Sequence, residues 1–416
     1  MDATRLPNGL RILSESLPDL PSVTVGIWVE NGSRYERDEQ AGISHFLEHL
    51  FFKGTARRTA AQIAEEIDAV GGVLNAFTGK EYTCYYAKVL REHLPLALDL
   101  LADIFTASRF AAEEIERERT VVIQEISQVE DTPDDYVHEL FNLAFWSGHS
   151  LGRPIAGTAE TVSGFARDDF LRFLDVRYRP DRVLIAAAGN LTHEHLVEVA
   201  SETFGALRGT APPVDSGPPQ AHAGVWVHEK SLEQVHLCLG TPGIAQADGD
   251  RYAAYLVNVA LGGGMSSRLF QEIRERRGKA YTVYSFLSSY LDAGYVGVYV
   301  GTNPDWTREV VDVVRSELAR VVRDGLGADE LTRAKKQMKG NMLLGLETSD
   351  SRMSRIAKNV IYFGRDIRLE EVAAGIDAVT NDDVMRVAGR LFAESAIGLT
   401  VLGDVKGDQL AGVLPG

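Results

Sequence analysis

Two stretches decide the fold, ARDDFLRFLDVRYRPDRVLIAAAGNL at residues 166–191 and TNDDVMRVAGRLFAESAIGLTVLGDV at residues 380–405. They match at a constant offset of 214 residues, which pairs Asp168 with Asp382 and Gly189 with Gly403. Each stretch has the pattern of a helix, a short loop, an apolar strand and a Gly-Asn or Gly-Asp turn. Because the register holds through both a helix and a strand, the pair predicts that the chain contains a duplication.

The remaining sequence of each half follows one order of elements. Strands come first, then a helix, then a pair of strands, and amphipathic helices close the half. The expected strands are 11–15, 23–29, 73–77 and 83–89 in the first half and 234–239, 282–288 and 294–300 in the second, and the expected helices include 42–53, 94–107, 114–129 and 251–261. Strands clustered with helical runs predict an α+β fold of two homologous domains, each an antiparallel-rich mixed sheet covered by helices.

The boundary between the halves is a Pro/Gly-rich stretch, RGTAPPVDSGPPQAHAG at residues 208–224. It holds four prolines and has no apolar periodicity, which is typical of a linker. We therefore expect a first domain at 1–207, a linker at 208–224 and a second domain at 225–416.

Composition limits the class of protein. With 416 residues, 45% apolar and 25% charged, the chain is typical of a globular protein with more than one domain. Its net charge of −16 argues against nucleic-acid binding and is compatible with basic peptide substrates. No apolar run approaches the length of a membrane span and no signal peptide is recognised, so we expect a cytoplasmic location, although a processed form would look the same. Cys84 and Cys238 are expected to be buried free thiols.

The motif His45-Phe46-Leu47-Glu48-His49 has the order H-x-x-E-H, the inverted form of a zinc-peptidase motif. On a helix, positions i and i+4 lie about 40° apart around the axis, so both imidazoles can bind one ion. Glu48 flanks that face and could take a proton from a metal-bound water. The alternative is two ordinary helix histidines, one in the core and one hydrogen-bonded, and composition alone favours that alternative.

The candidates for a third ligand lie in the expected helix 114–129. Catalytic zinc takes three protein ligands and keeps one position for water. Glu118 and Glu125 are seven residues apart, about two helical turns, so they project from one face. Glu125 stands in the apolar stretch VVIQEI, where a carboxylate is costly unless it is paired or binds a cation. A solvated carboxylate is the alternative for both residues, and it fits Glu118 better.

The stretch GISHFLEHLFFKGT at 42–55 resembles the signature of the M16 (pitrilysin-like) zinc metallopeptidases, especially the mitochondrial processing peptidase-like subfamily with its bacterial members. GGVLNAFTGKEYTCYYAKV at 71–89, RERTVVIQEI at 117–126 and SRLFQEIRERRGKAYTVYSF at 267–286 extend the resemblance over nearly the whole chain. It implies one Zn²⁺ per chain, held by His45, His49 and Glu125, with Glu48 as the catalytic base. Glu118 is then expected to hold the second ring nitrogen of a histidine ligand.

The resemblance also implies residues that bind the substrate. Asn75 and Ala76 would line the cleft on an edge strand that pairs with an extended peptide. Arg274 and Tyr281 would hold the substrate backbone and the carbonyl oxygen under attack, for which a guanidinium and a phenol are suitable donors. From the residues alone, a solvated helix arginine and a strand aromatic remain equally good interpretations.

The expected assembly also follows from the resemblance. Some bacterial relatives divide the zinc motif and the Arg/Tyr pair between two subunits, whereas this chain carries both. We therefore expect a homodimer that encloses a chamber, in which Arg274 and Tyr281 serve the zinc of the partner, and substrates that are peptides or unfolded segments. Two other readings are kept: a non-catalytic structural subunit of an M16-type complex, and a zinc hydrolase that does not act on peptides.

Overall fold

The computed structural model describes residues 1–212 and 216–414. The predicted linker residues Pro213, Val214 and Asp215 lie outside the described residues. The chain forms two compact units. The first consists of Met1–Gln128, Arg153–Ser216 and Gly345–Asp366, and the second of Val129–Gly152, Gly217–Leu344 and Ile367–Gly416.

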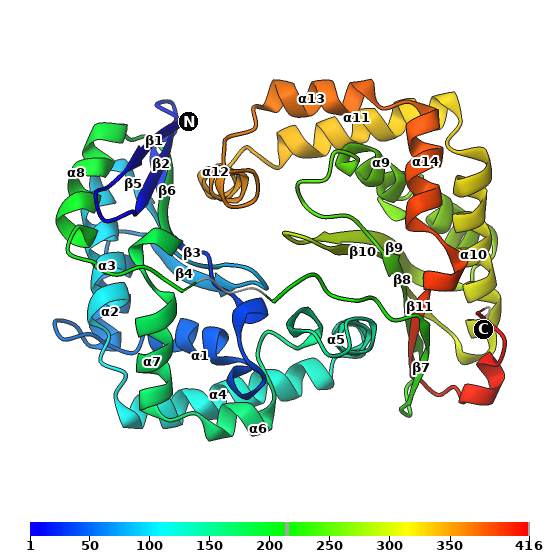
Figure 1. The fold of residues 1–416 in the computed structure, drawn as a ribbon, viewed down its shortest axis with the longest axis horizontal. Helices are drawn as coiled ribbons and strands as arrows, with labels where there is room; N and C mark the ends of the chain where they lie inside the picture. Colours follow the sequence, from blue (N-terminus) through cyan, green and yellow to red (C-terminus); the bar gives the residue numbers. More distant parts are fainter. Residues whose placement is uncertain (213–215, 415–416) are drawn as a thin grey trace. The chain divides into compact units, whose positions relative to one another are not determined.

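Within the described residues, the first unit is built on a six-stranded sheet (Figure 1). In sheet order its strands are β1 (Asp2–Arg5), β2 (Arg11–Ser16), β6 (Val183–Gly189), β3 (Ser22–Val29), β5 (Thr83–Leu90) and β4 (Val73–Thr78). β2 and β6 run parallel, and the other neighbours are antiparallel. β1 and β4 form the two edges of the sheet.

Both faces of this sheet are buried. Ile12, Ile27 and Tyr85 belong to the core on the face that packs against α3 (Leu94–Ala107) and α8 (His193–Phe204). The opposite face is covered by α12, and the core there includes Trp28, Cys84, Leu184 and Met353. The helix α12 spans Ser349–Phe363. Successive side chains of a strand point to opposite faces of the sheet. Because both faces are covered here, nearly all residues of the central strands are apolar.

The other helices of the first unit place the candidate site. α1 (Ile43–Leu50) packs on β4 and β5, at the edge of the sheet. The long α4 (Ala112–Glu130) follows α3, and its last two residues fall in the second unit. α2 (Ala60–Asp68), α6 (Ala159–Gly164) and α7 (Arg167–Arg177) complete the described helices longer than one turn.

The described part of the second unit contains a five-stranded sheet with the same arrangement. Its order is β7 (Gly224–Glu229), β11 (Gly398–Gly403), β8 (Val235–Pro242), β10 (Gly294–Thr302) and β9 (Ala280–Ser289). β7 and β11 are parallel and the other pairs are antiparallel, as for β2-β6-β3-β5-β4 of the first unit. The predicted fold class, two α+β domains with mixed sheets, is confirmed.

Helices cover this second sheet on both faces as well. α9 (Arg251–Gly262) packs on β9, and α10 (Thr307–Asp324) and α14 (Asn381–Leu391) lie on the same side. α11 (Ala328–Leu344) packs on α9 and α13 (Leu369–Ala378) on α11. The opposite face is covered by α5 (Pro133–Phe145), whose Phe141 and Phe145 contact Tyr295.

The two units exchange one helix each. α5 comes from the first half of the chain but belongs to the second unit, and α12 comes from the second half but belongs to the first. The predicted domains followed sequence order, so they place these two segments differently from the compact units. Within the part that the structure describes, the chain also passes between units at Ser216 and Gly217, inside the predicted linker. α7 and α14 begin and end 214 residues apart, the offset found in the sequence.

Two further expectations concern the cysteines and membrane-spanning helices. Cys84 and Cys238 are both buried and free, as predicted. Within residues 1–212 and 216–414, none of the helices combines the length and the apolar character that crossing a membrane requires.

Candidate metal centre

Two structural features fix the start of α1. Gly42, directly before the helix, has a φ of 95°, and a Cβ there would come within 2.5 Å of the Ala156 carbonyl oxygen, so glycine is required. The buried Glu36 carboxylate accepts hydrogen bonds from the backbone N–H groups of Gly42, at 2.9 Å, and Ser44, at 2.8 Å. Free N–H groups at a helix start need such acceptors, so Glu36 anchors the turn that carries the first histidine.

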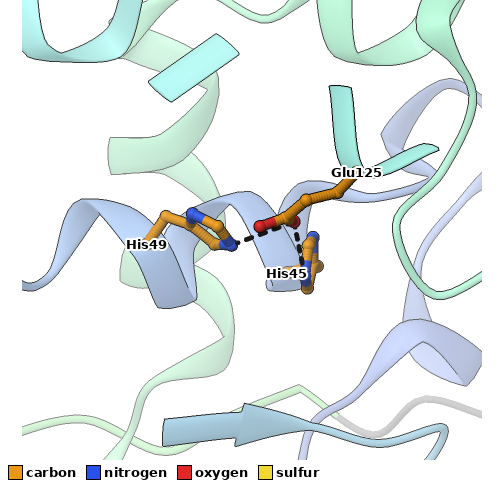
Figure 2. Close-up of side chains that lie close together, drawn as sticks. All are labelled: His45, His49 and Glu125. Atoms are coloured by element: carbon orange, nitrogen blue, oxygen red, sulfur yellow. Dashed lines mark ion pairs between the residues drawn. The ribbon is translucent and has the colours of Figure 1, made fainter. Parts of the chain in front are cut away.

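His45, His49 and Glu125 converge, as Figure 2 shows. The two imidazoles project from α1 with ring centroids 4.9 Å apart, and Glu125 reaches them from α4. Oε2 of Glu125 lies 3.7 Å from Nε2 of His45 and 3.4 Å from Nε2 of His49. Among the described residues, this is the one group of three or more His, Cys, Asp or Glu side chains whose ligand atoms all lie within 4.8 Å of one another.

The donor set fits zinc. Two imidazole nitrogens and one carboxylate oxygen are a ligand set that catalytic zinc sites use. Burial, and then the neighbouring His49, lower the pKa of His45 to about 4, so its imidazole is neutral near pH 7, the form that binds metal. Nδ1 of His45 is buried and has no hydrogen-bond partner among the described residues. His45, His49 and Glu125 would therefore hold the ion.

Glu118 lies behind His49. Its Oε2 is 3.2 Å from Nδ1 of His49, the nitrogen that points away from Glu125, and its Oε1 pairs with Lys53 Nζ at 2.7 Å. Glu118 is only 5% exposed. A carboxylate in this place fixes the tautomer and the orientation of a metal-binding imidazole.

Glu48 is half-buried beside the two histidines. Burial raises its pKa, while the hydrogen bond from Thr78 and the charge of His49 act in the opposite direction. Oγ1 of Thr78 donates to Oε2 of Glu48 at 2.6 Å. The carboxylate that the sequence predicts as the base is therefore held from β4.

The predicted substrate residues Asn75 and Ala76 lie on β4, at the edge of the first sheet next to α1. Oδ1 of Asn75 accepts a hydrogen bond from the N–H of Ala76 at 2.8 Å. Val73, at the start of the strand, is 50% exposed. An edge strand of this kind can accept another extended chain.

Arg274 and Tyr281 lie together in the second unit. The Arg274 guanidinium carbon is 4.6 Å from the centre of the Tyr281 ring and 4.8 Å from that of Phe270. Arg274 belongs to a π-helical segment, Phe270–Arg276, and Tyr281 is the extra residue where the register of β9 and β10 shifts. Tyr281 is 75% exposed. π-helical turns and β-bulges often occur at functional sites, where they redirect side chains.

Three residues around the centre were not found from the sequence: Glu36, Lys53 and Thr78. Lys53 stands one turn after His49, so its spacing was a usable signal. Threonine at the end of a strand is common, and nothing local connects Thr78 with Glu48, which is 30 residues away. Glu36 lies in a loop whose path the sequence pattern does not predict.

Comparison with known proteins identifies the family. Residues 11–159 match the family model described as "Insulinase (Peptidase family M16)", and residues 164–338 match "Peptidase M16 inactive domain". An uncharacterized zinc protease of Bacillus subtilis is 44% identical over 387 residues, which are 93% of this chain and 94% of the relative. The chain belongs to peptidase family M16. The resemblance predicted from the sequence is thereby confirmed.

Other M16 relatives cover similar lengths. An uncharacterized zinc protease of Streptomyces coelicolor is 44% identical over 98% of this chain and 90% of its own length. A solved protease structure from Helicobacter pylori has a TM-score of 0.89 at 22% identity and covers 97% of this chain and 99% of its own. A solved M16 inactive-domain structure from Pseudomonas fluorescens has a TM-score of 0.90 at 20% identity, covering 97% and 98%. These two structures share the fold.

Proposed function

We propose that this chain is a zinc-dependent endopeptidase that hydrolyses peptides or unfolded segments. The observation that carries the proposal is the convergence of Nε2 of His45, Nε2 of His49 and Oε2 of Glu125, with Glu48 on the same helix as the histidines. Relatives that are 43–44% identical and carry the name zinc protease support it.

The residues divide the chemistry among them. A zinc ion held by His45, His49 and Glu125 supplies a Lewis acid that polarises a carbonyl and makes water more acidic. Glu48 accepts a proton from the attacking water and donates it to the leaving amine as the peptide bond breaks. Glu118 keeps His49 oriented through Nδ1, and Lys53 pairs with the other oxygen of Glu118.

Substrate binding is assigned to both units. We propose that β4, with Asn75 and Ala76, binds an extended peptide by strand pairing. Arg274 and Tyr281 then donate hydrogen bonds to the substrate backbone and to the carbonyl oxygen under attack. In this proposal the protein is a homodimer, the Arg274–Tyr281 pair serves the partner's zinc, and hydrolysis takes place in a closed chamber. The net charge of −16 supports a preference for basic peptides.

Two alternative functions are compared with the peptidase proposal. A non-catalytic structural subunit needs no base beside the metal, whereas Glu48 is present and oriented by Thr78. A zinc hydrolase for other substrates would use the same centre, but an exposed edge strand beside it favours a peptide.

The deciding experiment combines hydrolysis with metal analysis. Wild-type protein, Glu48→Gln and the surface control Glu65→Gln are dialysed, their zinc is measured, and a quenched-fluorescence peptide library is added with and without chelator. We expect about one zinc per chain in all three, and hydrolysis lowered by roughly 10²–10⁴-fold in Glu48→Gln alone, the range for loss of a general base.

Each competing function has its own result. Glu48→Gln protein that cleaves at the wild-type rate would end the assignment of the base. Zinc-loaded wild-type protein that cleaves no peptide would favour the structural subunit, or a different hydrolase if it cleaves simple esters or amides instead.

A further inference from the structure

Thr78 connects the edge strand β4 with Glu48. It is the last residue of β4, and its hydroxyl donates to Oε2 of Glu48 at 2.6 Å. The contact is between side chains on different elements of the first unit, and it is partly buried. A short hydrogen bond to a carboxylate is stronger than one between neutral groups, so this contact is a substantial restraint on Glu48.

The end of β4 that carries Thr78 is firmly held. Directly after it, the N–H of Gly79 donates to the carbonyl oxygen of Tyr82 at 2.8 Å and closes the turn to β5. The N–H of Ser33 donates to the Gly79 carbonyl at 3.2 Å, and the N–H of Arg34 to the Lys80 carbonyl at 2.8 Å. The turn is therefore attached to the loop that precedes α1.

Two more features hold this turn. The guanidinium of Arg34 and the carboxylate of Glu81 form a buried ion pair at 2.6 Å. A Cβ at Gly32 would come within 2.3 Å of the Gly79 carbonyl oxygen, so the two backbones approach as closely as glycine allows. The other end of β4 is entered through Gly71 and Gly72, whose N–H groups donate to the carbonyl oxygens of Asp68 and Ile67 at 2.9 and 3.0 Å. Thr78 thus lies on a strand that is held at both ends.

The hydrogen bond also defines how the carboxylate is used. The hydroxyl of Thr78 donates to Oε2 of Glu48, and the backbone N–H of Thr78 adds a second hydrogen bond to the same carboxylate, which leaves other acceptor sites of the two oxygens for the attacking water. Without the hydroxyl, rotation about the last side-chain torsion of Glu48 is restricted less, because that torsion is intrinsically broad.

We propose that Thr78 is a positioning residue that fixes the orientation of Glu48 and makes it depend on the peptide bound along β4. The inference rests on the proposed peptidase function. A peptide that pairs with residues 73–77 contacts the strand that carries Thr78, and β4 is already paired with β5 along its length, so Thr78 links the bound peptide with the base. Residues of the substrate far from the cleaved bond thereby increase the rate of bond cleavage as well as affinity.

The experiment compares three variants with wild-type protein. Thr78→Val removes the hydroxyl at nearly constant volume, and Thr78→Ser restores it. Thr4→Val is the matched control, because Thr4 lies on the opposite edge strand β1 and its partly buried hydroxyl is 2.8 Å from His193 Nε2. kcat, KM and zinc per chain are measured with one peptide that the wild type cleaves, and with the same peptide shortened at either end.

We expect Thr78→Val to retain zinc and a KM within about twofold of wild type, while kcat falls about tenfold to a hundredfold, the scale on which misplacement of a catalytic group acts. Thr78→Ser recovers kcat to within about threefold, and Thr4→Val keeps both constants. Lengthening the peptide raises kcat in the wild type and has less effect on kcat in Thr78→Val.

Three results would overturn the inference: a wild-type kcat in Thr78→Val, loss of zinc in Thr78→Val, or an effect on KM alone. The first and third leave the peptidase proposal intact, since the wild type still cleaves. If wild-type protein with zinc cleaves no peptide, the peptidase proposal itself has failed, and the role proposed for Thr78 fails with it.

Discussion

The two units share a sheet order but differ at the edge strand. In the first unit α1 packs on the edge strand β4 and carries His45, Glu48 and His49. In the second unit α9 packs on the edge strand β9, and its sequence, RYAAYLVNVALG, has no histidine or acidic residue. Each copy therefore has a helix on its edge strand, and the proposed metal ligands His45 and His49 are on the helix of the first copy only.

The same contrast separates α4 from α11, which end 214 residues apart. At that offset, Thr332 stands where the first copy has Glu118, and Lys339 where it has Glu125. Lys339 forms an ion pair with Asp377 at 2.7 Å. A cation therefore stands where the first copy has the proposed ligand carboxylate, and the π-helical segment and β-bulge of the second copy carry Arg274 and Tyr281.

The largest effect is expected from removing the ligand that one copy has and the other lacks. Glu125→Ala should lose most of its zinc on dialysis and nearly all hydrolysis, because two histidines alone make a weak zinc site. Glu118→Ala should retain more zinc, with affinity lowered roughly 10–100-fold, the effect of losing a partner of a ligand. Metal analysis after dialysis, with Lys339→Ala as the control at the equivalent position, distinguishes them.

This series could also contradict the comparison. If Lys339→Ala lost zinc as readily as Glu125→Ala, the metal would not depend on the first copy alone. If Glu118→Ala lost more zinc than Glu125→Ala, the roles of the two carboxylates on α4 would have to be reversed.

A second test asks whether the two kinds of unit cooperate across a dimer. A His45→Ala chain and an Arg274→Ala chain should each be inactive or nearly so, since loss of one donor to the oxyanion alone costs roughly 10²–10³-fold. After mixing and exchange, about half of the dimers are mixed and each has one complete site, so about a quarter of wild-type activity should return. Tagged chains confirm that mixed dimers formed. Mixed dimers without activity would exclude action on the partner's zinc.

The smallest expected effect concerns Glu36, which anchors α1. Burial raises the pKa of Glu36 to about 7, against the hydrogen bonds from Ser44 and Gly42, which lower it. A carboxyl group whose pKa is higher in the folded protein binds its proton there more tightly. It adds stability at pH below about 4.5, and that contribution is lost as pH rises through about 7.

Glu36→Gln removes this titration. The difference in unfolding free energy between wild type and Glu36→Gln should therefore change in favour of the variant between pH 5 and pH 8, by roughly 1–3 kcal/mol. Urea unfolding at several pH values measures it, and titration of the zinc ligands cancels in the difference. A difference that stays constant over this range would show that Glu36 titrates as an ordinary carboxylate.

The sequence predicted the features that depend on the spacing of nearby residues, such as helices, strands and the residues that share one helix face. The spacing of His45 and His49 predicted that they share one face of a helix, the choice of Glu125 over Glu118 came from the family resemblance, and the sheets were predicted because strand and helix periods differ. The exchange of α5 and α12 was missed, because an apolar stripe shows that a helix face is buried but not against which sheet. The bulge at Tyr281 and the contact of Thr78 with Glu48 depend on tertiary packing, which no local pattern encodes.

The exchange of α5 and α12 has a consequence for synthesis on the ribosome. The last strand of the first sheet ends at Gly189, and the helix that covers the face with Trp28 and Leu184 begins at Ser349. At about 5–20 residues per second, roughly 10–30 seconds pass before that helix is made. During this interval the face with Trp28 and Leu184 lacks the helix that covers it, so the first unit completes its core only after most of the chain has been made.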